Sequence, residues 1–159
     1  MSYMFARTSD GKPEVEPTGE YTIILPEGFR IVKDLILDLN LQGMFSGYDN
    51  YKSLIVDFSN LPVQTGDNFK GKECNLSYMF QNCYWVRSIE FVGDSKVPTA
   101  FSSGTNMSYM YQNCQKLKKI TDDASCIPNC FKEIDKVTDF SHMFDGCISL
   151  EEYSLTRED

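Results

Sequence analysis

The stretches NLSYMFQNC (Asn75–Cys83) and NMSYMYQNC (Asn106–Cys114) decide how this chain is interpreted, because they repeat almost the same nine residues. Two further copies align with them, NLQGMFSGY (Asn40–Tyr48) and DFSHMFDGC (Asp139–Cys147). The first apolar residues of the four copies are 35, 31 and 33 residues apart, at Leu41, Leu76, Met107 and Phe140. A recurrence of this length is typical of repeat proteins, whose units bury their apolar faces against one another.

Each copy has the residue pattern of a short helix. An Asn or Asp comes first, as at an N-cap, and apolar residues follow at i, i+3 and i+4, on one face of a helix. The copies close on the residue types that most readily end a helix in the left-handed conformation, namely Gly47, Asn82, Asn113 and Gly146. The pattern predicts four helices of about two turns. Finding Asn106 inside a strand would contradict this assignment.

Apolar residues also recur six residues beyond the end of each copy, and in three of the four copies again at eight residues. This alternation is typical of the inward face of a short strand. We therefore expect an α/β repeat solenoid, leucine-rich-repeat-like, with short helices stacked behind one sheet of short strands. Residues 40–159 would hold about four units of this solenoid.

Residues 1–39 do not fit the repeat, and we expect them to form an N-terminal β cap within one compact domain, since the end of a stack exposes its core. YTIIL (Tyr21–Leu25) and RIVKDLILDL (Arg30–Leu39) have the composition of strands. The opening MSYMFA (Met1–Ala6) imitates the repeat but lacks the preceding Asn and the following Cys. We predict a strand there as well.

The segment VTDFSHMFDGCISLEEYSL (Val137–Leu155), with LSYMFQNCYWVRSIEF and MSYMYQNCQKLKKI, resembles the BspA-type leucine-rich repeats of bacterial surface proteins, in the branch with a Met-Ser-x-Met-Phe-x-x-Cys core. In the first copy Gly43 and Tyr48 replace the expected Tyr and Cys. The resemblance implies a right-handed solenoid that displays a binding surface and has no catalytic residues to carry over.

We accordingly expect a non-enzymatic protein-interaction or adhesion module, whose partner is a protein or a surface glycan. The alternative is a structural or decoration component of a larger particle such as a phage virion, because the chain starts at a plausible native Met and shows no export signal. The expected location is the cell surface if a leader was removed, and otherwise the virion or the cytoplasm.

Charge and composition argue against several other classes. A formal charge of -8 disfavours binding to nucleic acid or anionic lipid, which depends on Lys and Arg. No apolar run approaches the roughly 20 residues that span a bilayer, so we expect no membrane insertion. With one His and no Gly-rich phosphate loop, we expect no cofactor and no catalytic site.

The outward residues of the predicted strands form the candidate binding face, because leucine-rich repeats often bind ligands through this face. The simpler interpretation is a solvated sheet surface. The candidate residues are Lys52, Ser53, Ile55, Arg87, Ser88, Glu90, Lys118, Lys119, Thr121, Glu151, Glu152 and Ser154.

Cys83, Cys114 and Cys147 share one repeat position and should form a ladder with about 5 Å between neighbours. Equivalent side chains of stacked units point in parallel, which is poor geometry for a disulfide. We therefore expect small buried thiols.

CIPNC (Cys126–Cys130) could close a loop disulfide, or could combine with His142 into a nucleophilic or partial zinc site. His142 occupies the repeat position of Tyr78 and Tyr109, so a structural aromatic role is the better interpretation. A zinc site normally needs four ligands. We expect no metal site.

Overall fold

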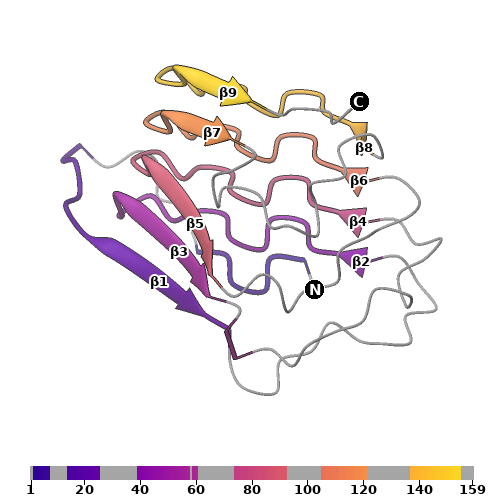
Figure 1. Cartoon of the computed structure of the whole chain (residues 1–159), viewed down its shortest axis with the longest axis horizontal. Coiled ribbons are helices and arrows are strands. Elements are labelled where there is room, and N and C mark those ends of the chain that lie inside the picture. Colours follow the sequence, from indigo (N-terminus) through magenta and orange to yellow (C-terminus); the bar gives the residue numbers. More distant parts are fainter. Residues whose placement is uncertain are drawn as a thin grey trace.

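The computed structural model describes residues 2–7, 14–25, 39–57, 59–60, 74–92, 105–121 and 137–154. These residues form short parallel strands joined by runs of turns (Figure 1). The strands are β1 (Glu20–Ile24), β2 (Leu39–Asn40), β3 (Ser53–Asp57), β4 (Cys74–Asn75), β5 (Ser88–Val92), β6 (Thr105–Asn106), β7 (Lys119–Thr121), β8 (Val137–Asp139) and β9 (Glu152–Ser154).

The strands make three separate parallel sheets, ordered β1-β3-β5, β2-β4-β6-β8 and β7-β9. In Figure 1 the very short strands β2, β4, β6 and β8 form a column on one side, and the longer strands lie on the other. The pairing keeps the repeat in register, since Leu54 lies opposite Ile89 and Asn75 lies opposite Asn106. Equivalent residues of neighbouring units therefore lie side by side.

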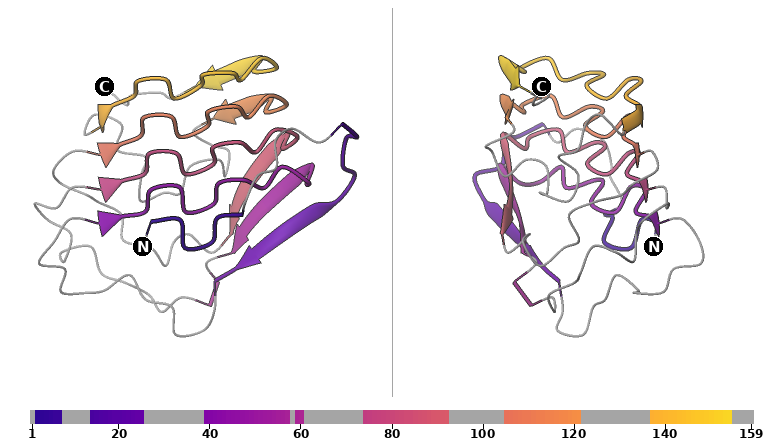
Figure 2. Two further views of the ribbon diagram at one scale, coloured as in Figure 1. Left: turned by 180° about the vertical axis from the view of Figure 1, so that it is seen from behind. Right: turned by 45° about the vertical axis from the view of Figure 1, so that its right-hand side comes forward.

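The predicted helices are wrong, and with them the predicted α/β solenoid, because the described residues contain no helix. Each predicted helix is instead a run of turns that zigzags between two strands (Figure 2). In the second copy Tyr78 and Asn82 have φ values of 61° and 62°. A right-handed helix requires negative φ at every residue. The sequence predicted the left-handed conformation at the closing residue, Asn82. It gave no sign of the left-handed conformation at Tyr78, four residues earlier.

Hydrogen bonding explains why turns replace helices. The amide of Met79 donates to Leu76 O within its own run at 3.2 Å, whereas the next amide, Phe80 N, donates to Met110 O of the following unit at 2.8 Å. In an α-helix both amides would donate to carbonyls four residues earlier in the same segment. A left-handed non-glycine residue costs about 1–2 kcal/mol, and net hydrogen bonds of about 1 kcal/mol each to the neighbouring unit offset that cost.

The predicted N-cap residues have a different role. Asn106 is the last residue of β6, which contradicts the helical assignment. Its Oδ1 accepts hydrogen bonds from Ser108 N at 2.8 Å and from Ser108 Oγ at 2.7 Å. The equivalent oxygens of Asn40, Asn75 and Asp139 also accept the amide two residues ahead. These are Asx-turns that lead each strand into its run of turns.

The opening segment is also a run of turns rather than the predicted strand. Tyr3 N donates to Gln42 O at 2.7 Å and Arg7 N donates to Ser46 O at 2.9 Å, the pattern that joins all later units. Tyr3 has the left-handed φ of 54° found at the equivalent positions. Ser2–Arg7 therefore stacks on the first predicted unit as a further copy of the run.

Strand prediction succeeded better than helix prediction. The expected strand at Tyr21–Leu25 corresponds to β1, which pairs in parallel with β3. The second strand expected in the cap, apart from its last residue, lies outside the described residues. The expected single sheet is wrong, because β1-β3-β5 and β7-β9 are separate sheets. In the sequence, Asp122 stands eight residues beyond the end of its copy, a position that is apolar in the other three copies.

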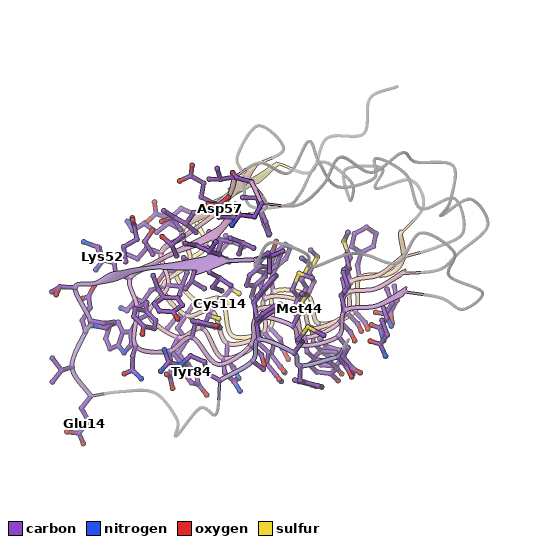
Figure 3. The ribbon with its side chains drawn as sticks, turned by 90° about the horizontal axis from the view of Figure 1, so that it is seen from below. Glu14, Met44, Lys52, Asp57, Tyr84 and Cys114 are labelled. Carbon is purple, nitrogen blue, oxygen red and sulfur yellow. The ribbon has the colours of Figure 1, made fainter. Side chains whose placement is uncertain are left out.

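The core lies between the longer strands and the runs of turns. Figure 3 shows Met44 and Cys114 in this interior. The inward strand residues Leu54, Val56, Ile89 and Phe91 are buried, as the alternation predicted. One aromatic row crosses the stack with ring centroids 5.6 to 6.1 Å apart, formed by Phe5, Phe45, Phe80, Tyr111 and Phe144.

Candidate functional site

The outward row of β3 and β5 projects away from the core. Ser53 and Ile55 are half-buried, and Ser88 and Glu90 are exposed. The hydroxyls of Ser53 and Ser88 hydrogen-bond each other at 2.7 Å, so part of this row is already paired within the sheet. Lys52, just before β3, is exposed (Figure 3). The remaining predicted row residues Lys119, Thr121, Glu152 and Ser154 lie on β7 and β9, and their side chains are outside the described part.

An open groove of about 520 Å³ lies where the sheet of longer strands is interrupted. Its lining combines three members of the predicted face, Arg87, Lys118 and Glu151, with residues of the turns before β7 and β9. This volume is within the usual range for ligand pockets. The residues from the turns are Lys116, Ile148, Ser149 and Leu150.

The groove concentrates cations on a chain whose formal charge is -8. Lys118 pairs with Glu151 at 3.2 Å, with 53% and 70% of the side chains exposed. Lys116 lies over the ring of Trp85, with Nζ 5.4 Å from the centroid. Exposed ion pairs contribute about 1 kcal/mol or less, so a competing ligand could displace Glu151 at small cost.

The side chain of Arg87 is less exposed than that of Lys118. It forms an ion pair with Glu16, from the segment before β1. Its Nε is buried and has no hydrogen-bond acceptor among the described residues. A buried donor without a partner costs about 1–3 kcal/mol.

Lys116 and Ile148–Leu150 were not among the predicted site residues. Lys116 occupies the same repeat position as Trp85, two residues beyond the copy-ending Cys, so the repeat alignment alone could have placed these side chains next to each other. The side chain of Ile148 is 77% exposed. The repeat pattern of the sequence did not identify Ile148 as a site residue, because the groove depends on a break in the sheet that the pattern does not predict.

The cysteine ladder is structural. All three cysteines are free thiols; Cys83 and Cys114 are buried, as predicted, whereas Cys147 is only half-buried. Each sulfur donates to a carbonyl of the preceding unit, with Cys114 Sγ 3.2 Å from Phe80 O and Cys147 Sγ 3.1 Å from Tyr111 O. Burial raises the pKa of Cys114 well above its ordinary value and that of Cys147 to about 11. Neutral thiols of this kind are poor nucleophiles.

His142 continues an aromatic row, as its repeat position predicted. Its ring stacks on Tyr109 with centroids 4.8 Å apart, and Tyr109 stacks on Tyr78 at 4.9 Å. Its Nδ1 lies 3.4 Å from a carboxylate oxygen of Asp145. The expected alternatives at Cys126 and Cys130 lie outside the described residues.

Within the described ranges, no cluster of three or more His, Cys, Asp or Glu side chains could hold a metal ion. The same residues include no helix of the length and apolar character required to cross a bilayer. Comparison of the chain with known protein families, curated proteins and solved structures gave no match. The leucine-rich-repeat resemblance therefore stays a prediction from the residues alone.

Proposed function

We propose that this protein is a non-enzymatic interaction module that binds a protein partner through the groove between β5 and β7. The observation that supports this function is the grouping of Arg87, Lys116 and Lys118 around one hollow of an otherwise acidic chain. The exposed side chain of Ile148 provides an apolar contact on the same lining. Cations beside apolar surface suit an acidic segment of a partner that also carries an apolar side chain.

The groove offers few means of chemical catalysis. Among the described residues of the lining there is no Cys, His or Asp, and the one carboxylate, Glu151, is exposed and paired with Lys118. Nucleophilic or acid–base catalysis needs an activated group next to an orienting partner. The lining is better suited to recognition, in which acidic groups of a partner neutralise the two lysines.

The test is a binding comparison between two variants of equal charge. The double substitution Lys116→Gln with Lys118→Gln removes two charges from the groove. The control, Thr22→Glu with Asn40→Asp, lowers the charge equally at exposed positions away from it, since Thr22 lies on β1, separated from β5 by β3. Asp139 shows that Asp can form the turn made by Asn40. Partners captured from the native source are identified by mass spectrometry, and their affinities are then measured with purified components.

We expect the groove variant to bind the captured partner about tenfold more weakly or worse, a loss of about 1.4 kcal/mol. The control should bind like the wild type. Both variants should melt near the wild-type temperature, because exposed substitutions usually change stability by about 0.5 kcal/mol or less. Equal binding by groove variant and wild type would remove the groove as the recognition site.

A further inference from the structure

The described units contact one another in a fixed direction. Amides of an earlier run of turns donate to carbonyls of the next run. Tyr109 N donates to Ser141 O at 3.0 Å, and Asn113 N donates to Asp145 O at 2.7 Å. The same pattern joins every neighbouring pair of runs, beginning with Tyr3 N and Gln42 O. A stack built this way presents donors at one end and acceptors at the other.

The donor end is the run at 141–146. His142 and Gly146 are the equivalents of Tyr109 and Asn113, and their amides have no acceptor among the described residues. The side chain of His142 is 54% exposed, and Phe140 beside it is 41% exposed. β8 and β9 are the outermost strands of their sheets at this end (Figure 1).

The acceptor end is the run Ser2–Arg7. Ser2 and Ala6 are the equivalents of Ser141 and Asp145, and their carbonyls accept no hydrogen bond from the described residues. Tyr3 and Met4 are 47% and 50% exposed. β1, which follows this run, is the outer strand of its sheet. Unpaired backbone groups along such an edge are a template for another chain.

We propose that copies of this chain associate head to tail, with the run at 141–146 of one copy stacking on Ser2–Arg7 of the next. Following the internal register, His142 N would donate to Ser2 O and Gly146 N would donate to Ala6 O. The ring of His142 would cover Tyr3 as it already covers Tyr109. A second copy fits this face because it carries the same acceptor pattern that the donor run meets inside the chain.

Charge supports the same pairing. Arg7 is exposed at the acceptor end, and Asp145 is exposed at the donor end. In the internal register Arg7 corresponds to Gly146, the residue after Asp145, so the two opposite charges would lie at neighbouring positions of the contact. Within its own chain the Arg7 guanidinium donates to Tyr51 Oη at 2.7 Å. Such a contact leaves one donor end and one acceptor end free, so association is open-ended rather than closed. This property is separate from partner binding at the groove.

The experiment blocks one end at a time in the full chain. Met4→Asp with Tyr3→Ala blocks the acceptor end, because a carboxylate would be buried against the next copy. Phe140→Asp with His142→Asp blocks the donor end, because the substitution at His142 sets a carboxylate against the ring of Tyr3 and the substitution at Phe140 adds a second carboxylate to the same contact. Val92→Asp, at an exposed apolar residue in the middle of the stack, is the control. Sedimentation velocity over micromolar to millimolar concentrations measures association.

We expect the mass of the wild type and of Val92→Asp to rise with concentration beyond that of a dimer. Each blocked variant alone should associate about tenfold more weakly or worse. An equimolar mixture of the two should form a heterodimer and nothing larger, because each retains one intact end. If either blocked variant melts early, Met4→Ser and His142→Ser replace it. A monomeric wild type, a wild type that stops at a dimer, or a mixture without heterodimer would overturn the proposal.

Discussion

Tyr48 forms the bond that cysteines form in the later units. Its hydroxyl donates to Phe5 O at 2.9 Å, whereas Cys114 Sγ donates to the equivalent Phe80 O. The two residue types share little chemistry apart from a donor that reaches a buried carbonyl. Burial raises the pKa of Tyr48 to about 12, so the folded chain holds its phenol in the neutral, donating form.

Tyr48→Phe should lower the free energy of unfolding by about 1 kcal/mol at neutral pH, because Phe5 O loses its donor. The folded pKa of about 12 exceeds the ordinary 10.0, so the contribution of the neutral phenol is complete below pH 10. It is lost as the pH rises from 10 towards 12. Wild type should therefore lose more stability over this range than Tyr48→Phe, as measured by denaturant unfolding.

The half-buried Tyr84 supplies the control for this prediction, since Tyr84→Phe also removes a hydroxyl. That variant should lose less stability at neutral pH than Tyr48→Phe. Identical pH profiles for wild type and Tyr48→Phe would contradict the assigned role of the phenol.

At the scale of the element, the run of turns depends on left-handed residues at fixed places. Gly47 has a φ of 80°, and a Cβ there would lie 2.2 Å from the carbonyl oxygen of Arg7. Asn82 and Asn113 occupy the equivalent positions with φ of 62°, where Asn113 Nδ2 donates to Asn82 Oδ1 at 2.9 Å. Glycine is thus needed at the first of these positions by contact as well as by conformation.

Gly47→Ala should destabilise the chain by more than about 2 kcal/mol, because it adds left-handed strain to a clash with backbone. Gly19→Ala is the matched control, since its Cβ would meet only Tyr51 Cδ1 at 4.0 Å. That variant should stay within about 1 kcal/mol of the wild type. Thermal unfolding followed by circular dichroism measures both, and equal melting temperatures would show that the close approach at Gly47 is unimportant.

At the scale of the whole molecule, stability should come from stacking rather than from any single unit. The aromatic row shows this dependence on position. Phe80, in the middle, is fully buried between Phe45 and Tyr111, with centroids 5.7 and 5.6 Å away. Phe144, in the last described unit, is half-buried. The two phenylalanines occupy the same repeat position.

Phe80→Ala should cost about 3–5 kcal/mol, because it opens a cavity between units on both sides. Phe144→Ala should cost at least about 1 kcal/mol less, since less of its ring leaves water on folding. Urea unfolding of the two variants makes the comparison. A loss at Phe144 as large as that at Phe80 would count against a stability that depends on position in the stack.

The sequence by itself determined the repeat, its register and the side chains that face the core. The inward positions at Leu54 and Val56, the free thiols at Cys83 and Cys114, and the left-handed closing residues all follow from spacing and residue type. These features depend on which neighbour a side chain meets at a fixed repeat position, and alignment of the copies supplies that information. Alignment of the copies also put Arg87, Lys118 and Glu151 on one predicted face, and these three are among the residues that line the groove.

Only the tertiary structure decided between helix and turn, and where the sheet breaks. The apolar spacing of NLSYMFQNC suits both conformations, and the choice rests on whether Phe80 N donates within its own segment or to Met110 O, 30 residues along the chain. The break between β5 and β7, which opens the groove and places Lys116 and Ile148 in its lining, likewise depends on pairing between distant strands. Local spacing cannot encode these outcomes, because the competing hydrogen bonds exist only once the units have stacked.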